Sequence, residues 1–450
     1  MRRLGIAWLC LASFSCAGMQ KQRGHDELAK NVKARLGADT RWQDGPPAEA
    51  DIAKWVGALL EAGLTRDRAI EIALVNNRSL QATYEALGIS QADLVQAGLL
   101  KNPSLSLHIG FPLGSGQNEL TGSLVQDFLD LFMLPLRKRI AQEQFATEVL
   151  RVSSEAIEVA LHAAQEYVAL QAAAQLVDMQ RTIVESTAAA TELAQRQFDA
   201  GNINALALTE KTVFREQALI DLLREQTELL AHRERLNVLL GLWGPQTEWK
   251  LEEPLPALPK SDPAIEHLEA LAIKQRFDIT AARNEVSMLG RAVTMARDFR
   301  LFGRVEVGVD AHRDPDGPRV IGPSLTLELP IFDQRQAMIG RLEAQQRQAE
   351  RRLAALSIQA RSDVRLARAK LAAARVTAER YDKVLQPLRG KIVDLSQLYY
   401  NGMFISPYQL LMAKQAQTES SRAAVMILRD YWIARAELEL AIGSRLDAIQ

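Results

Sequence analysis

The chain has 450 residues, and its 54 lysines and arginines nearly balance its 55 aspartates and glutamates. This balance gives no global basic field for nucleic acid, and a hydrophobic content of 48 % excludes an intrinsically disordered chain. Both cysteines, Cys10 and Cys16, lie close to the N-terminus, so the rest of the chain has neither a disulfide nor a thiolate metal site.

The N-terminal stretch has the pattern of a secretory signal, which we place at residues 1–15. Arg2 and Arg3 precede an apolar run at 4–14 that is too short to span a bilayer. Small residues flank Cys16, as in a bacterial lipoprotein processing site, which predicts a lipid on Cys16. Ordinary signal cleavage near this position is the alternative.

Residues 16–63 are predicted to form a mostly extended N-terminal arm. The stretch is polar and irregular, and Asp44-Gly45-Pro46-Pro47 marks a clear break in any regular structure.

The remainder is a tandem repeat. Residues 73–80 align with 272–279 at an offset of 199, and Gly201 aligns with Gly402 at an offset of 201. We therefore divide the chain into a first repeat at 64–240, a linker at 241–263, a second repeat at 264–443 and a tail at 444–450. The linker is rich in glycine and proline, which predicts a hinge-like surface crossing.

Each repeat is predicted to open with one helix, to continue with two strands and to close with a long helical hairpin. The opening helices lie at about 65–100 and 264–300, and the long helices at roughly 135–200 and 334–400. Apolar residues spaced by three, four and seven form two seams on the first long helix, so neighbours can pack on both of its flanks. A wall of helices packed side by side is the favoured interpretation, and a large soluble bundle is the alternative.

Four segments of period two are predicted strands, at about 103–111, 118–128, 303–312 and 319–329. Apolar residues on one face and polar residues on the other are typical of a transmembrane β-barrel, although a solvated sheet alternates in the same way. Four strands cannot close a barrel, and an open edge cannot lie in lipid, so the chain must oligomerise. The strands alone allow a dimer, a trimer or a tetramer.

Two related turns are predicted at the tips of the hairpins. Phe198 precedes Gly201 in the first, and Tyr399 precedes Gly402 in the second. Glycine adopts the left-handed conformation that stops a helix, and Asn204 or Ser406 can cap the helix that follows.

This order of elements resembles the TolC family of outer-membrane efflux proteins. The resemblance covers about residues 60–443, and the lipoprotein-like start resembles the lipidated branch that includes OprM, CusC and CzcC. Short motifs in a specific order carry it: Leu64-Thr65, Asn76-Asn77-Arg78-Ser79-Leu80, Arg276-Phe277-Asp278-Ile279, Leu329-Pro330-Ile331-Phe332 and Tyr399-Tyr400-Asn401-Gly402.

The resemblance implies a mainly α fold with a membrane β-barrel. Four strands from each chain of a homotrimer would form a twelve-stranded barrel, and the long helices would form a periplasmic α-helical barrel. It also implies an outer-membrane location and work with a periplasmic adaptor and an inner-membrane pump, of which the RND type is favoured. Such a channel is a passive exit duct for substrates such as metal ions or drugs.

The residues at the second tip depart from the family pattern. Tyr399 matches the family's gate tyrosine, but the positions of its gate Arg and Asp residues hold Phe404, Tyr408 and Leu411. We therefore predict a gate closed mainly by apolar and aromatic packing. The predicted tip set is completed by the two turns: Phe198, Gly201 and Gly402.

Three acidic residues, Glu306, Asp310 and Glu328, fall on the polar strand faces, where a ring of copies would favour cations. Solvated polar filler is the alternative. His108 and His312 are too few for a metal site, and the chain has no phosphate loop and no nucleophile arrangement.

We therefore expect no catalytic residue, no metal and no cofactor. A lipid-tethered coiled-coil scaffold or adaptor and a duct for type I protein secretion are the alternative functions. The exported substrate and the particular pump and adaptor are open at this point.

Overall fold

The computed structural model describes residues 23–42, 45–111, 114, 118–252, 254–263, 266–313 and 317–448. The predicted signal and the lipidation site at Cys16 lie outside these residues. Among the described residues, none of the helices combines the length and the apolar character that crossing a membrane requires.

The contacts divide the chain into two compact units, and each unit takes segments from both repeats. The first holds the described residues of 1–27, 85–152 and 277–357, and the second holds those of 28–84, 153–276 and 358–450. The repeats are therefore a division of the sequence, and their proposed boundaries stay a prediction.

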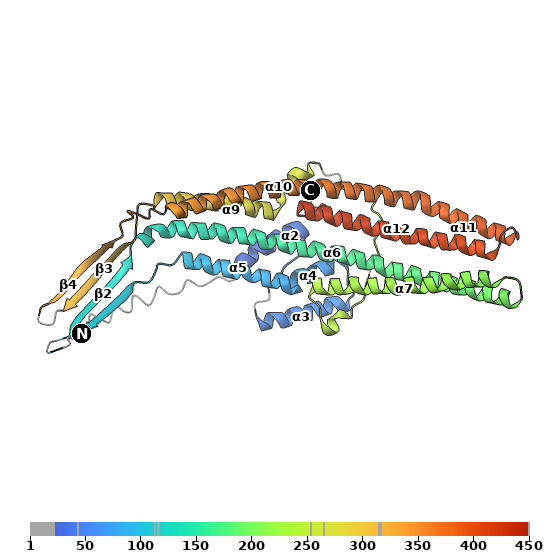
Figure 1. Ribbon diagram of the computed structural model, residues 1–450, viewed down its shortest axis with the longest axis horizontal. Coiled ribbons are helices and arrows are strands. Elements are labelled where there is room, and N and C mark those ends of the chain that lie inside the picture. Colours follow the sequence, from blue (N-terminus) through green and yellow to red (C-terminus); the bar gives the residue numbers. More distant parts are fainter. Residues whose placement is uncertain are drawn as a thin grey trace. The chain divides into compact units, whose positions relative to one another are not determined.

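The first unit contains one antiparallel sheet with strand order β1-β2-β3-β4 (Figure 1). Its strands agree with the predicted four: β1 (Ser104–Gly110), β2 (Glu119–Asp127), β3 (Val305–Arg313) and β4 (Arg319–Leu327). The central pair joins the two repeats, with Leu124 of β2 opposite Val309 of β3.

The register places most apolar residues of the four strands on one face of the sheet, with Val125 and Val320 on the other. Leu105 is opposite Leu124, and Val307 is opposite Leu325. Side chains alternate along a strand, so a shift of one residue in any strand would mix the two faces. The apolar residues of this face are exposed in the single chain: Leu105, Leu107, Ile109, Leu120, Leu124, Val307, Val309, Ile321, Leu325 and Leu327.

Helices of the first unit are joined by ion pairs, the first between the repeats and the second within the second repeat. Arg151 of α6 (Leu129–Asp199) contacts Glu285 of α9 (Phe277–Asp298) at 2.6 Å. Arg297 of α9 also contacts Glu343 of α10 (Gln336–Arg380), at 2.5 Å.

The second unit corrects the prediction of an extended N-terminal arm. Residues before Leu64 form two helices, α2 (Arg23–Leu36) and α3 (Pro46–Glu61). The apolar side chains of these helices recur at helical spacing and are buried, which the turn residues around Gly45 obscure in the sequence. These buried side chains are Leu28, Val32, Leu36, Ile52, Val56 and Leu60.

The opening helix of each repeat is broken, where the sequence predicted one continuous helix. Asn77 separates α4 (Arg66–Asn76) from α5 (Arg78–Ala97), and Arg276 separates α8 (Leu268–Gln275) from α9. Both residues are extended, with φ and ψ of −61° and 118° at Asn77 and of −65° and 126° at Arg276. The breaks are 199 residues apart, which is the offset of the repeat.

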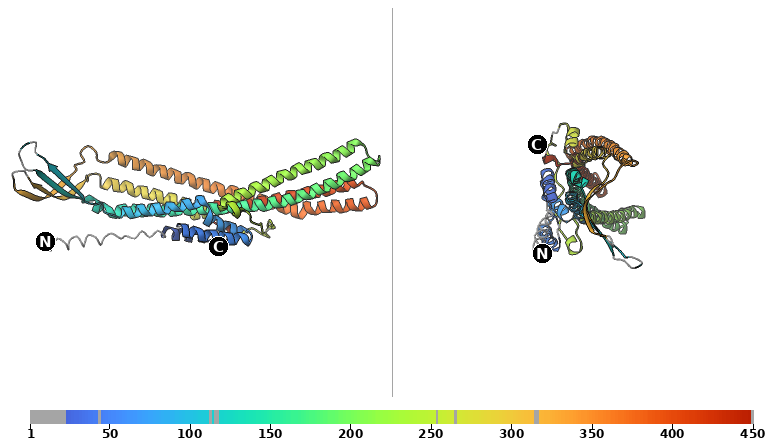
Figure 2. Two further views of the ribbon diagram at one scale, coloured as in Figure 1. Left: turned by 90° about the horizontal axis from the view of Figure 1, so that it is seen from below. Right: turned by 90° about the vertical axis from the view of Figure 1, so that its left-hand side faces the viewer.

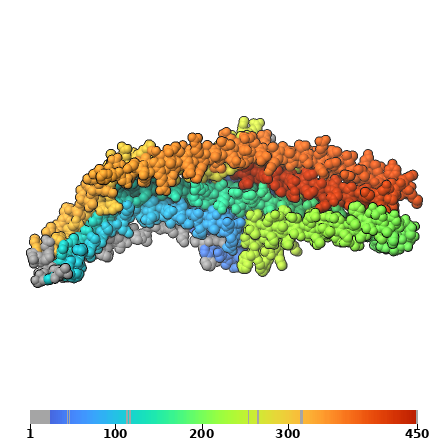
Figure 3. Space-filling model, in the orientation of Figure 1, coloured from blue at the N-terminus to red at the C-terminus, as the bar shows by residue number. Residues whose placement is uncertain are grey.

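Two long hairpins extend through the second unit, and their tips lie at the same end (Figures 1 and 2). The first is formed by α6 and α7 (Ala205–Leu240), and the second by α11 (Gln386–Asn401) and α12 (Pro407–Ile442). Side chains of the second hairpin, orange to red, lie against those of the first, in green, in the space-filling view (Figure 3).

The predicted second long helix contains a π-helical turn, η3 (Tyr381–Leu385), between α10 and α11. The Gln386 N–H donates to the Tyr381 carbonyl, five residues back. Pro387 has no N–H and its ring would clash with the carbonyl four residues back in a regular α-helix, so the wider turn accommodates it.

The linker is fastened to helices of the second unit, contrary to the hinge-like crossing predicted from its composition. The Arg375 guanidinium donates to the carbonyls of Pro259 and Lys260, each at 2.8 Å. The Trp432 indole donates to the Pro256 carbonyl at 2.9 Å, and the Tyr431 hydroxyl donates to Asp262. Glycine and proline content alone therefore misjudged this segment, because helix side chains satisfy its carbonyls.

The C-terminal segment packs against helix α2. The Arg445 N–H donates to the Arg35 carbonyl at 3.1 Å, and the Arg445 guanidinium contacts Asp67 at 2.5 Å. Leu446 is buried in a core with Leu268 and Ile442, so the chain's last turn is part of the second unit.

Candidate gate at the helical tips

The first tip is a glycine turn as predicted by the sequence. Gly201 has a φ of +75°, and the Asn202 N–H returns to the Gln197 carbonyl at 2.8 Å. The Asn204 side chain then accepts from the Ala207 N–H and caps α7. Phe198 lies just before this turn and is partly exposed.

The second tip differs in which residue is left-handed. Gly402 has a φ of −81°, and Met403, with a φ of +60°, takes the left-handed position, which corrects the prediction for Gly402. A Cβ on Gly402 would lie 2.7 Å from the Phe404 ring. The Phe404 ring therefore packs onto the Gly402 backbone, whereas the φ of Gly402 itself does not call for glycine.

A capping box orders the chain directly after the second tip. The Ser406 side chain accepts from the Gln409 N–H at 3.3 Å, and the Gln409 side chain accepts from the Ser406 N–H at 2.9 Å. Two backbone donors at the start of α12 are thus satisfied, as the predicted cap requires.

The apex of the second hairpin presents large apolar side chains to its surroundings. Met403 is 94 % exposed and Phe404 is 78 % exposed. The Phe404 ring stands edge-on to the Tyr399 ring, with 6.2 Å between the centroids and 82° between the planes. This pair holds the Phe404 ring at the apex.

Tyr408 makes a polar contact that the sequence analysis missed. Its hydroxyl donates a hydrogen bond to the Gln197 side-chain oxygen at 2.6 Å, so it joins the start of α12 to the end of α6. Burial raises the pKa of the Tyr408 hydroxyl, which keeps the proton in place for this bond. The Lys211 ammonium lies 4.9 Å from the Tyr408 ring centroid, a cation–π contact.

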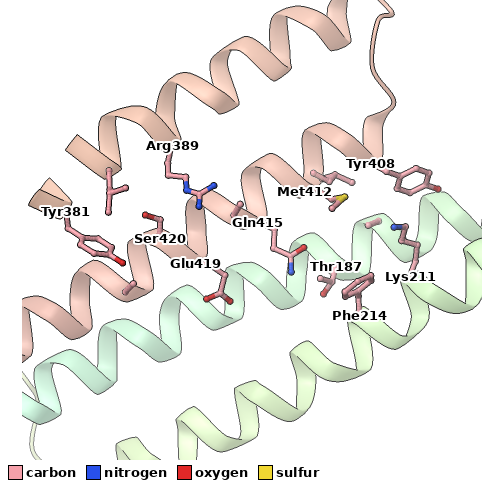
Figure 4. Close-up of a pocket in the computed structure, with 15 residues that line it drawn as sticks. Thr187, Lys211, Phe214, Tyr381, Arg389, Tyr408, Met412, Gln415, Glu419 and Ser420 are labelled. Atoms are coloured by element: carbon pink, nitrogen blue, oxygen red, sulfur yellow. The ribbon is translucent and has the colours of Figure 1, made fainter. Parts of the chain in front are cut away.

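A groove of about 640 Å³ lies between the two hairpins below these tips. Figure 4 shows Arg389 extending from α11 towards α12, with Lys211 and Phe214 of α7 near Tyr408. Leu411, another predicted tip residue, lines this groove. The predicted tip residues thus occupy three places: the first turn, the exposed apex of the second hairpin, and the groove.

The predicted lumen acids lie on the polar face of the sheet unit but have different neighbours. Glu306 is 3.5 Å from the Arg304 guanidinium, and Glu328 accepts from the Arg304 backbone N–H at 3.0 Å. Asp310 lies opposite Ser123 and Gly322 and is exposed. Asp310 is therefore the acid of the three with the most open surroundings.

His312 lies within β3, at the end of the strand predicted at about 303–312. It hydrogen-bonds to Thr121 at 2.9 Å, and His108 is opposite Thr121 on the other side. Across the residues that the structure describes, no group of three or more His, Cys, Asp or Glu side chains is placed to hold a metal ion.

Known proteins resemble this chain in both sequence and structure. Residues 69–242 match the family model described as outer membrane efflux protein. The cobalt-zinc-cadmium resistance protein CzcC of Cupriavidus metallidurans is 24 % identical over 299 residues, which cover 64 % of this chain and 67 % of CzcC.

Among solved structures, CusC superimposes with a TM-score of 0.70 at 18 % identity, covering 84 % of this chain and 91 % of CusC. The Campylobacter jejuni CmeC outer membrane channel gives a TM-score of 0.72 at 15 % identity, covering 90 % of this chain and 89 % of CmeC. Residues 69–242 thus match the outer membrane efflux protein family, and the chain has the fold of these outer-membrane channels.

The likeness to solved structures confirms the predicted fold class, and the family match supports the predicted efflux role and outer-membrane location. TolC-family proteins are transport channels and do not form an enzyme family. In this chain, the groove and the Tyr408 contact are the features of the tips that sequence reasoning did not find. Tyr408 and Gln197 are 211 residues apart, so only the fold brings them together.

Proposed function

We propose that this protein is the exit channel of a tripartite efflux pump, opened and closed at its helical tips. The observation that carries the proposal is the exposed apex of Met403 and Phe404 beside the Tyr408 contact to Gln197. Such apolar side chains at a turn favour burial against copies of themselves, and a hydrogen bond between hairpins can hold that arrangement.

A homotrimer is the proposed assembly, and exposed apolar seams on the hairpins support it. On α7, Leu206, Val213 and Ile220 recur every seven residues and are exposed. On α11, Leu388, Ile392, Leu395 and Tyr399 follow the alternating spacing of a coiled-coil seam and are also exposed. Copies of the chain packed side by side would cover both seams.

The sheet supports the same assembly, because its insertion in lipid would also require several copies of the chain. Its apolar face is exposed, and β1 and β4 are edges with unpaired backbone groups. Strands from further copies would satisfy those edges, since open edges are not tolerated in a bilayer. The polar face, with Asp310, would then line the lumen and favour cations.

The partners of the channel are proposed from the family. We propose a periplasmic adaptor and an RND-type inner-membrane pump, with a lipid on Cys16 as a further anchor to the outer membrane. CzcC is described as a cobalt-zinc-cadmium resistance protein. Together with the acidic lumen positions, this makes divalent metal ions the first substrates to test, with drugs as the second class.

Conductance of the purified protein in planar bilayers tests the gate. We expect small closed-state currents in the natural protein and larger ones after Phe404→Ala or Tyr408→Ala, with the trimer intact on size-exclusion chromatography. Unchanged currents in both variants would contradict the gate. A monomer without conductance would contradict the channel and favour the lipid-tethered scaffold.

A second experiment addresses the substrate. Cells lacking the gene are compared with the parent for tolerance of cobalt, zinc and cadmium salts and of a panel of drugs. Loss of metal tolerance alone supports metal export, and loss of drug tolerance alone assigns the channel to drugs.

A further inference from the structure

We propose that the groove between the two hairpins is a binding site for small organic anions with an apolar body. Such a ligand would bridge α7 of the first hairpin and α11 of the second. The inference stands apart from the proposed gate, because binding can be measured whether or not the tips open and close.

The size of the groove is the first observation. Its volume of about 640 Å³ falls within the range of roughly 300–1,000 Å³ that is typical of small-molecule sites. Its walls are largely apolar or aromatic, and they are formed by four helices and the π-helical turn. These apolar and aromatic residues include Phe214, Tyr381, Leu385, Tyr408, Leu411 and Met412.

The charged residues that line the groove indicate whether its ligand is an anion or a cation. The groove is lined by two cations, Lys211 and Arg389, and by one acid, Glu419. Glu419 contacts the Arg422 guanidinium at 3.2 Å, and Glu225 contacts the same guanidinium at 2.5 Å. Within the described part of the chain, neither Lys211 nor Arg389 forms an ion pair. The two cations without an ion pair therefore outnumber the single carboxylate of the groove, so the charges of the lining favour an anion.

Lys211 is held where such an anion would meet it. Its ammonium lies 4.9 Å from the Tyr408 ring centroid and 5.6 Å from the Phe214 ring centroid. A cation held on aromatic faces is partly shielded from water, so its attraction for an anion is stronger than that of a freely solvated lysine. The aromatic faces beside it would contact the apolar body of the same ligand.

The π-helical turn is an independent observation that points to the same place. Tyr381 and Leu385 lie within the turn, Arg389 follows four residues later, and all three line the groove. π-helical turns within α-helices occur frequently at functional sites, because the extra residue changes which side chains face one direction. Here the turn places an aromatic, an aliphatic and a cationic side chain in succession along one wall.

Calorimetric titration of the purified, assembled protein in a non-ionic detergent tests this site. The probe is 2-naphthalenesulfonate, and the matched probe of opposite charge is 2-naphthyltrimethylammonium, each also titrated into detergent alone. We expect saturable binding of the sulfonate and none of the ammonium probe. Equal binding of the two, or a sulfonate signal no larger than the detergent blank, would overturn the proposal.

Substitutions locate the binding. Arg389→Gln is expected to weaken sulfonate binding about tenfold, the loss of one charge-assisted hydrogen bond, whereas Arg389→Lys should lose less. The matched control is Arg361→Gln, an exposed arginine of α10 outside the groove, which should bind within about twofold of the natural protein. If Arg389→Gln and Arg361→Gln bind alike, the site is not this groove.

Hydrogen exchange gives a readout that does not require any variant to fold. Saturating sulfonate should slow amide exchange both at 381–389 and around 208–214, because the ligand contacts both hairpins. Slowing at neither segment, with binding still present, would place the sulfonate elsewhere and reject the proposal.

Discussion

The Tyr408 hydroxyl donates to the Gln197 side chain at 2.6 Å and so links the first turn of α12 to the last turn of α6. One neutral hydrogen bond contributes about 0.5–1.5 kcal/mol. Tyr408→Phe keeps the ring and removes only this bond, so the ratio of open to closed channels should rise about two- to tenfold. Single-channel recording measures the open probability directly.

Tyr399→Phe is the control for this prediction. It removes a hydroxyl from the same tip but keeps the edge-on contact with Phe404. Equal open probabilities in the two variants would show that the hydrogen bond to Gln197 has no special role.

Asp310 is expected to dominate ion selectivity among the three lumen acids. Arg304 contacts Glu306 and donates its N–H to Glu328, and this local pairing reduces what either carboxylate offers to a passing ion. Asp310→Asn should lower the cation-to-anion permeability ratio more than Glu328→Gln does. Reversal potentials in a salt gradient give the ratio, and an equal effect of both variants would count against this ranking.

Glycine is needed at position 241 for two reasons: the backbone is left-handed there, and a side chain would clash with a neighbouring segment. Gly241 has a φ of +66°, and a Cβ there would lie 2.2 Å from the Asn76 carbonyl oxygen. Gly244 has a φ of +57° but open space around it. Gly244→Ala should lower the free energy of unfolding by about 1–2 kcal/mol, because alanine is strained in the left-handed conformation. Gly241→Ala should lower it clearly more, because its Cβ also clashes. Thermal unfolding followed by circular dichroism compares the two.

The contact between Tyr431 and Asp262 predicts a loss of stability at high pH. Burial, followed by the hydrogen bond to Asp262, raises the pKa of Tyr431 from its ordinary value of 10 to about 12. Because the folded pKa lies above the unfolded one, this stabilising contribution is full below about pH 10 and is lost as the pH rises through about 12. The midpoint of thermal unfolding should fall over this window.

Tyr431→Phe supplies the comparison for that titration. Without the hydroxyl, the variant should show a smaller fall in the unfolding midpoint between pH 10 and 12. Parallel curves for the two proteins would mean that another group causes the alkaline loss.

Pro387 is expected to keep the π-helical turn locally weak. Pro387→Ala restores a backbone N–H and removes the ring, which favours the helix by up to about 3 kcal/mol. Amide exchange at 381–391 should slow in this variant. Pro407→Ala is the control, because Pro407 is at the first position of α12, where proline is tolerated, and it should not slow exchange there.

Much of the fold is predictable from local patterns in the sequence. The strands alternate between apolar and polar residues, so the face of Leu105, Leu124 and Val309 can be assigned before the register is known. The cap at Ser406 is equally local, since serine followed three residues later by glutamine predicts a capping box at the start of a helix.

What the sequence does not predict depends on contacts between distant segments. Gly402 was assigned a left-handed conformation because glycine commonly has that role, but Met403 takes that position in the folded chain. The linker carbonyls are bound by Arg375 and Trp432, which lie more than a hundred residues away. The cations of the groove, Lys211 and Arg389, likewise come from different hairpins.

The hydrogen bond from the Arg445 N–H to the Arg35 carbonyl has a consequence for biogenesis. Helix α2 is synthesised long before Arg445, to which it is hydrogen-bonded in the folded chain. Contacts of such large sequence separation form slowly, and incomplete intermediates expose apolar surface. The second unit is therefore expected to be completed late, only after Arg445 has been synthesised.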